Sequence, residues 1–190
     1  MGNKIVNTKS VIIYTLIVGT ILGVFSILSD IIPYQLEDEN IFGIALFISG
    51  GVMNNLAVWL ILSMIAGYKF CNSFKSSAIA GASFTVYAII LYFIFSYLIR
   101  MDVKPSFDWS VFLIWILGSG FGGAMGSTTG FLARRYEILW GIPVVFIAVQ
   151  LIRYGERIWC QPTSIATNII LLAVAFGILI FGISKAYKKH

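Results

Sequence analysis

The chain alternates long apolar blocks with short polar connections. Almost all apolar residues fall in six blocks, each close to the ~20 residues that a helix needs to cross the hydrocarbon core of a bilayer. Segments of about ten residues with alternating polarity, which are typical of outer-membrane barrels, do not occur. The pattern predicts an all-α, polytopic integral membrane protein, with one domain over residues 1–190 and six transmembrane helices in one bundle. The predicted spans are residues 11–29, 44–66, 78–99, 111–133, 138–153 and 167–186.

The fourth predicted span carries a stripe of glycines at intervals of four residues. In a bilayer, where lipid tails are as apolar as leucine side chains, small residues at this spacing let another helix backbone approach closely. Since glycine is otherwise costly within a helix, we expect the stripe to serve helix packing. Its members are Gly118, Gly122, Gly126 and Gly130.

The composition agrees with lipid as the main solvent. Hydrophobic residues make up 59% of the chain and charged residues only 11%, whereas soluble domains carry about 25% charged residues. The net charge of +5 follows from the placement of basic residues at the connections, described next, and we therefore predict no nucleic-acid partner.

Basic residues gather at alternate connections between the predicted spans. Nine of the thirteen precede the first span, follow the second and fourth spans, or follow the last one. They are Lys4, Lys9, Lys69, Lys75, Arg134, Arg135, Lys185, Lys188 and Lys189. Because Lys and Arg in short loops stay on the cytoplasmic side, both termini are predicted to be cytoplasmic, which requires an even number of spans. The first span is expected to be retained rather than cleaved, because no small-x-small site precedes the acidic connection that begins at Asp30.

Catalytic and metal-binding signatures are weak or missing in the sequence. The only histidine is His190, so neither a Ser–His pair within the membrane nor an HExxH site can form. Cys71 and Cys160 are predicted to lie on opposite sides of the bilayer, and no CxxC occurs. The GxGxxG match at residues 118–123 is in mid-span, where a dinucleotide site cannot form. We predict no catalytic residue, no metal and no cofactor.

Two asparagines, Asn54 and Asn55, lie near the middle of the second predicted span. An unpaired amide in hydrocarbon is expensive, and consecutive helical residues point about 100° apart, so at least one amide should face the bundle interior. It would either bond to a neighbouring helix or line a polar cavity.

A second polar group lies where the fifth predicted span approaches the outer surface. Gln150, Arg153 and Arg157 fall on one helical stripe. Two guanidinium groups on one face suit a carboxylate or phosphate ligand. The alternative is an interfacial salt bridge between Arg153 and Glu156, and in either case Asp30 could be a structural counter-ion.

Three stretches carry a resemblance to known families: WILGSGFGGAMGSTTGFLARR, GGVMNNLAVWLILSMIAG and LWGIPVVFIAVQLIRYGERI. With the six-span length, they resemble a family of small bacterial inner-membrane proteins classed as domains of unknown function, which implies no activity. The chain is also loosely similar to the substrate-binding subunits of energy-coupling-factor transporters. In those proteins small residues on the first helix dock the coupling subunit, and Gly19 and Gly23 form a comparable pair here.

Three classes of function are compatible with these patterns. The first is a protein of the bacterial cytoplasmic membrane that binds or transports a small solute, with or without a separate partner subunit. The second is a structural or accessory membrane protein that packs against itself or against a partner span. An enzyme is the least favoured class. The residues predicted to bind a ligand in the first class are Asn54, Asn55, Gln150, Arg153 and Arg157.

Overall fold

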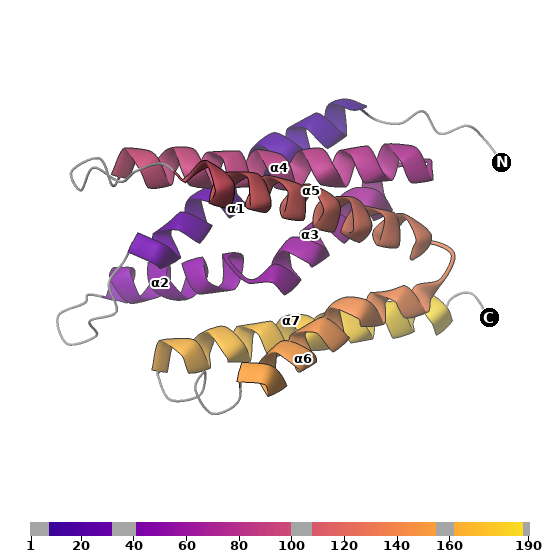
Figure 1. Ribbon diagram of the computed structural model, residues 1–190. Helices are drawn as coiled ribbons and strands as arrows, with labels where there is room; N and C mark the ends of the chain where they lie inside the picture. Colours follow the sequence, from indigo (N-terminus) through magenta and orange to yellow (C-terminus); the bar gives the residue numbers. More distant parts are fainter. Residues whose placement is uncertain (1–7, 32–40, 100–107, 155–161, 188–190) are drawn as a thin grey trace.

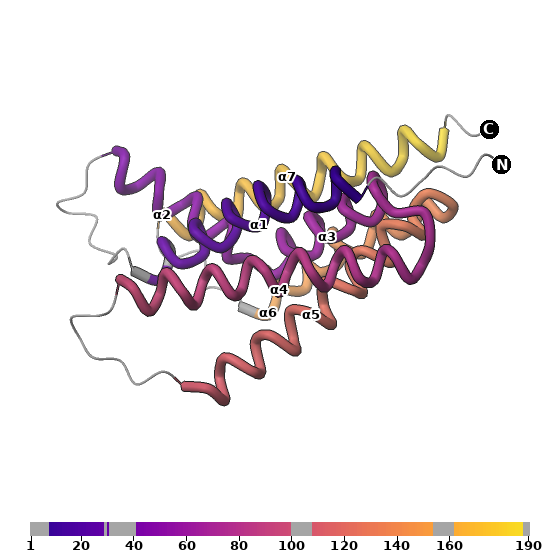
Figure 2. The backbone as a smooth tube through the Cα atoms, turned by 90° about the horizontal axis from the view of Figure 1, so that it is seen from above, coloured from indigo at the N-terminus to yellow at the C-terminus, as the bar shows by residue number. Residues whose placement is uncertain are grey.

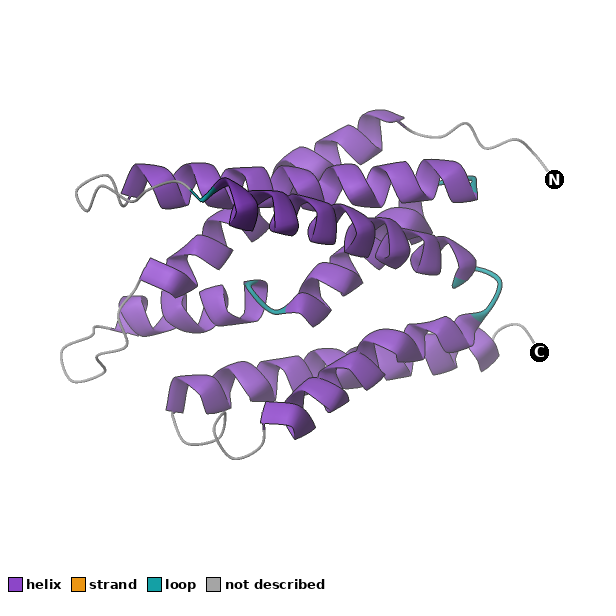
Figure 3. Ribbon diagram, viewed as in Figure 1, coloured by secondary structure: helices purple, strands orange, loops and turns teal. Residues whose placement is uncertain are grey.

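The computed structural model describes residues 8–31, 41–99, 108–154 and 162–187. Of these residues 93% are helical and none forms a strand, which confirms the predicted all-helical architecture (Figure 3). The elements in chain order are α1 (Thr8–Ile31), α2 (Ile41–Met53), α3 (Leu56–Phe70), α4 (Phe74–Ile99), α5 (Trp109–Leu132), the 3₁₀ helix η2 (Glu137–Trp140), α6 (Gly141–Tyr154) and α7 (Pro162–Tyr187).

Four of these helices are long and apolar enough to cross a membrane, namely α1, α4, α5 and α7. A fifth crossing results if α2 and α3, which meet at a bend of 65°, count as one span. The predicted span 44–66 is therefore not one straight helix. The predicted span 138–153 is also divided, because it begins as η2 and continues as the 14-residue α6. At 1.5 Å per residue α6 covers roughly 21 Å, less than the ~30 Å hydrocarbon core.

The helices run alternately from one end of the bundle to the other (Figures 1 and 2). The start of α1, the end of α7 and the connections from α3 to α4 and from α5 to η2 all lie at one end. We call it the basic end, because the described chain places six basic residues there: Lys9, Lys69, Lys75, Arg134, Arg135 and Lys185. The ends of α1, α4 and α6 lie at the opposite end.

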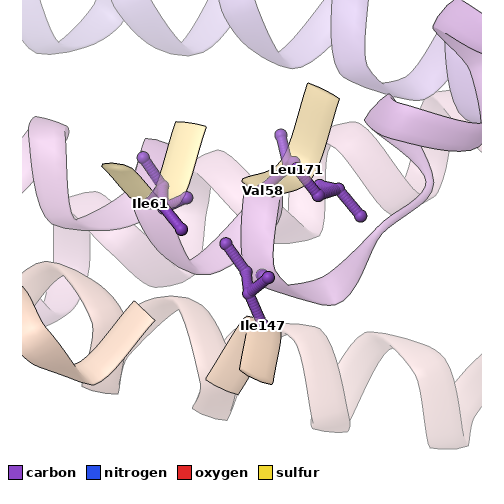
Figure 4. Close-up of a cluster of buried hydrophobic side chains, with 6 residues drawn as sticks. Val58, Ile61, Ile147 and Leu171 are labelled. Carbon is purple, nitrogen blue, oxygen red and sulfur yellow. The ribbon is translucent and has the colours of Figure 1, made fainter. Parts of the chain in front are cut away.

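Helix α3 is the centre of the bundle. Its residues Val58 and Ile61 pack with Ile147 of α6 and Leu171 of α7 (Figure 4). On another side of α3, Trp59 joins a cluster with residues of α1 and α4. Contacts on several sides fix α3 in place, and with it the bend where α2 ends.

Close backbone contacts join α5 to its neighbours. A Cβ on Gly130 would overlap the Met64 carbonyl of α3, and a Cβ on Gly81 of α4 would overlap the Gly123 carbonyl. Ser77 of α4 donates a hydrogen bond to the Ser127 carbonyl at 2.6 Å. These contacts are the small-residue packing expected between helices in lipid.

Two of the four glycines of the predicted stripe face a neighbouring helix of the described chain. Gly126 and Gly130 face α3, but added Cβ atoms at Gly118 and Gly122 would meet nothing within 4 Å. The reason is helical geometry. Four residues advance around the helix axis by about 400°, so glycines at this spacing rotate by about 40° per step and turn away from a straight neighbouring helix. Gly123 lies against α4 instead, where an added Cβ would overlap the Gly81 carbonyl.

Gly19 and Gly23 of α1 are used within the chain. A Cβ on Gly19 would lie 2.7 Å from the Tyr87 ring, and one on Gly23 would lie 2.7 Å from the Ala88 carbonyl. Both glycines therefore face α4. The expectation that this pair docks a partner subunit does not fit this placement.

Candidate functional site

The most unusual feature of the bundle is the break between α2 and α3. Gly50 and Gly51 weaken the end of α2, because glycine is a poor helix former. Asn55 then begins a new helix: its backbone is extended, and its Oδ1 accepts a hydrogen bond from the Ala57 amide at 2.9 Å. Asparagine is among the best residues for this N-cap role. The local sequence thus ends one helix and starts another.

The carbonyl of Met53, at the end of α2, is held by two side chains. The indole Nε1 of Trp59 donates to it at 2.8 Å, and the Ser26 hydroxyl of α1 donates at 3.4 Å. Non-helical backbone at membrane depth needs such partners, because no water is present to satisfy its polar groups. Helices α1 and α3 therefore both stabilise the break.

Asp30 connects the break to α1 and α4. The Asn54 side-chain amide donates to Asp30 Oδ1 at 3.4 Å, and the Tyr92 hydroxyl of α4 donates to Asp30 Oδ2. We call Asp30, Met53, Asn54, Trp59 and Tyr92 the helix-break cluster. Asp30 and Asn54 are exposed in the structure and Tyr92 is half-buried. The cluster combines a carboxylate, an amide and a hydroxyl, which suit a solute that carries hydrogen-bond donors.

The two asparagines have different roles. Asn55 is buried, and its side-chain oxygen caps α3 by accepting from the Ala57 amide of its own segment. Asn54 is exposed and makes a bond between helices, through Asp30. Of the two predicted alternatives, the interhelical hydrogen bond is therefore the one seen, and only at Asn54.

The second predicted polar group lies elsewhere. Gln150 is half-buried and Arg153 is exposed on α6, and neither has a hydrogen bond or an ion pair with another described residue. Arg157 lies outside the described residues. Within the described chain α6 packs on α3, α7, and η2, and makes no contact with α1, α2 or α4. The structure therefore does not bring α6 to α1 and α4, the helices that hold Asp30 and Tyr92.

Sequence reasoning missed Tyr92 and the buried polar residues of α7. Tyr92 appears in the sequence as one of several aromatic residues typical of lipid anchoring, and nothing marks it as a partner of Asp30. On α7, Thr163 and Asn168 are buried, and Thr167 lies against Gly51 of α2. The polar run TSIATN at the start of an apolar span is the signal that could have found them. Among the described residues no group of His, Cys, Asp and Glu side chains is arranged to hold a metal ion.

Comparison of the chain with protein families, with curated proteins and with solved structures gives no match.

Proposed function

We propose that this chain is an integral membrane protein that binds a small solute and carries it across the bacterial cytoplasmic membrane, with the helix-break cluster as the binding site. The observation that carries the proposal is the convergence of α1, α4 and the α2–α3 break on Asp30. Four to five apolar helices of membrane-spanning length provide the setting.

The physical argument concerns what a break in a membrane helix exposes. A broken helix presents carbonyl groups and amide groups that a continuous helix uses internally, and membrane transporters hold substrates and ions at such places. Here a carboxylate and an amide side chain lie beside the break and are not buried by the rest of the described chain. A solute with ammonium, amide or hydroxyl donors fits these acceptors best.

The proposal includes the membrane topology. It takes α2 with α3 as one crossing and η2 with α6 as another, which gives six crossings in total. The basic end faces the cytoplasm, because basic residues in short connections resist translocation. Both termini are then cytoplasmic, and Asp30 lies towards the outside. A separate partner subunit that drives solute movement would dock on a surface other than Gly19 and Gly23, because both face α4.

The test is native mass spectrometry of the protein purified in mild detergent, with an Asp30→Asn variant. We expect the wild-type protein to retain a small molecule whose mass is distinct from that of a phospholipid, and the variant to retain much less of it. Asp108→Asn is the matched control. Asp108 caps α5 through the amides of Ser110 and Val111, a role that asparagine also fills.

Two results would contradict the proposal. One is a wild-type protein that retains no small molecule. The other is an Asp30→Asn variant that retains the molecule as well as the Asp108→Asn control does.

A specific observation favours a second candidate, a structural or accessory membrane protein. Gly118 and Gly122 lie on a face of α5 that no other described helix covers, and Phe121 and Met125 beside them are exposed. A partner span could pack closely there. The mass spectrum separates the candidates, because this one predicts a retained protein partner or a second copy and no solute.

A further inference from the structure

Three aromatic rings from three different elements meet at the basic end. Trp140 of η2 lies 5.3 Å from Tyr68 of α3 and 5.2 Å from Phe181 of α7, measured between ring centroids. Tyr68 and Phe181 are 6.2 Å apart. All three pairs have the edge-to-face geometry that aromatic rings prefer. The trio therefore forms a rigid apolar platform that joins α3, η2 and α7.

Cationic groups lie on and beside this platform. The guanidinium carbon of Arg134 lies 5.9 Å from the centroid of Tyr68, and Lys185 Nζ lies 5.7 Å from that of Phe181. Lys69 follows Tyr68 in the chain and is exposed. Within the described chain none of these three cations is paired with a carboxylate. We call Lys69, Arg134 and Lys185 the basic rim.

Exposed apolar surface adjoins the basic rim. Phe181, over whose ring Lys185 lies, is 37% exposed, and Ile138 of η2, two residues before Trp140, is 86% exposed. A soluble anion would satisfy the cations but would leave these side chains in water. A phospholipid satisfies both, because its phosphate meets the cations while its acyl chains cover Phe181 and Ile138.

We infer that the basic rim is a binding site for the phosphate headgroup of an anionic phospholipid, in the leaflet that meets the basic end. The lipid neutralises cations carried by α3, by the segment after α5, and by α7. It thereby holds three parts of the bundle together, and its binding is independent of any solute at the helix-break cluster.

The experiment compares thermal unfolding of the full-length protein in nanodiscs of phosphatidylglycerol and of phosphatidylcholine. We expect a higher Tm in phosphatidylglycerol, because this lipid binds only the folded state of the rim. The variant Lys69→Gln/Lys185→Gln should lose most of that shift. Arg134 is left unchanged in this variant, because its side chain donates to the carbonyls of Gly67 and Tyr68 and caps α3.

The matched control is Lys9→Gln/Lys75→Gln. It removes the same charge from exposed lysines at the same end of the bundle, but from α1 and α4 rather than from the rim. The control should keep the full shift, and Lys69→Arg/Lys185→Arg should keep it as well, because charge is retained. These two variants also reveal whether a loss in the rim variant comes from folding or from lipid binding.

Three outcomes would overturn the inference. The first is a wild-type protein with the same Tm in both lipids. The second is an equal loss of the shift in the rim variant and in the control, which would mean that net charge alone matters. The third is a shift of the same size when inorganic phosphate is added to phosphatidylcholine discs, which would identify a free anion as the ligand.

Discussion

At the scale of single residues, this bundle depends on positions that have no side chain. Gly67, Gly81, Gly123 and Gly130 lie so close to carbonyl groups of neighbouring helices that a Cβ at any of them would overlap the opposite backbone. A protein backbone cannot move aside as a flexible side chain can. The helix contacts of α5 with α3 and α4 are therefore sensitive to the addition of one methyl group.

The first prediction compares two glycines on the same helix. Gly130→Ala should destabilise the protein by about 1 to 3 kcal/mol, because overpacking forces the α3 and α5 backbones apart. Gly122→Ala should be neutral or slightly stabilising, because its Cβ would meet open space. Thermal unfolding of both variants in the same detergent is the measurement. Equal melting temperatures for the two variants would mean that the α3–α5 contact is looser than described.

The sequence indicated that α5 packs through small residues, but it could not indicate which ones. The spacing of four residues favoured Gly118 and Gly122, whereas Gly123 and Ser127 make contacts in the structure. Small residues are frequent in this segment, so the sequence alone does not distinguish one face of the helix from another. Only the position of α3 and α4 decides among them, and that position depends on the whole bundle.

At the scale of elements, the break between α2 and α3 is formed by residues of that segment and stabilised by hydrogen bonds from side chains elsewhere in the chain. Asn55 caps α3 from within the segment. Trp59 and Ser26 bond to the Met53 carbonyl, and Asp30 bonds to Asn54. The apolar pattern predicted a continuous span over residues 44–66, because both halves are strongly apolar. Gly50-Gly51 followed by Asn54-Asn55 is a breaking signal in retrospect, yet glycine pairs also occur in unbroken membrane helices.

The second prediction tests the cap of α3. Asn55→Ala should cost about 0.5 to 2 kcal/mol, because the Ala57 amide loses its acceptor at the start of the helix. Asn55→Ser should keep most of the stability, since serine is also a good N-cap residue. Unfolding curves of the two variants provide the measurement. If Asn55→Ser is as damaging as Asn55→Ala, the asparagine has a role other than capping.

Pro143 does not break the helix in which it lies. Pro143 is the third residue of α6. At this position the backbone amide has no carbonyl partner within the helix, so proline loses no hydrogen bond there. The irregular part comes earlier, as the 3₁₀ turn η2, which presents Trp140 to Tyr68 and Phe181. The proline therefore starts a helix instead of interrupting one.

At the scale of the whole molecule, the distribution of basic residues agrees with the order in which the helices run from one end of the bundle to the other. The start of α1 and the end of α7 share one end of the bundle with the two short described connections, and basic residues are concentrated there. This arrangement was predictable, because positive charge in short loops is visible in the sequence. The position of α6 was not, because its contacts with α3 and α7 depend on packing between segments far apart in the chain.

The third prediction concerns the side of the membrane that the basic end faces. Cys71 is unsuitable as a reporter, because it is fully buried, and burial raises the pKa of its thiol and so lowers the reactive thiolate fraction at neutral pH. The exposed neighbour Asn72 is suitable. In a Cys71→Ser/Cys160→Ser background, Asn72→Cys should resist a membrane-impermeant maleimide in intact cells and react after lysis.

A Cys71→Ser variant that keeps Cys160 is the counterpart, and we expect it to react in intact cells. Cys160 itself lies outside the described residues. Labelling of Asn72→Cys from outside would place the basic end outside and contradict the proposed orientation.

The central position of α3 has a consequence for biosynthesis. A ribosome delivers α3 well before α6 and α7, yet Val58 and Ile61 of α3 pack against those two later helices. Until they arrive, this side of α3 has no permanent neighbour, and Tyr92 has not yet reached Asp30 when the break first enters the membrane. The nascent chain thus passes through a stage in which its polar break is covered by α1 alone. We expect a chain stopped after α3 to be a preferred substrate of membrane chaperones and proteases, and the arrival of α4 to α7 to end that vulnerability.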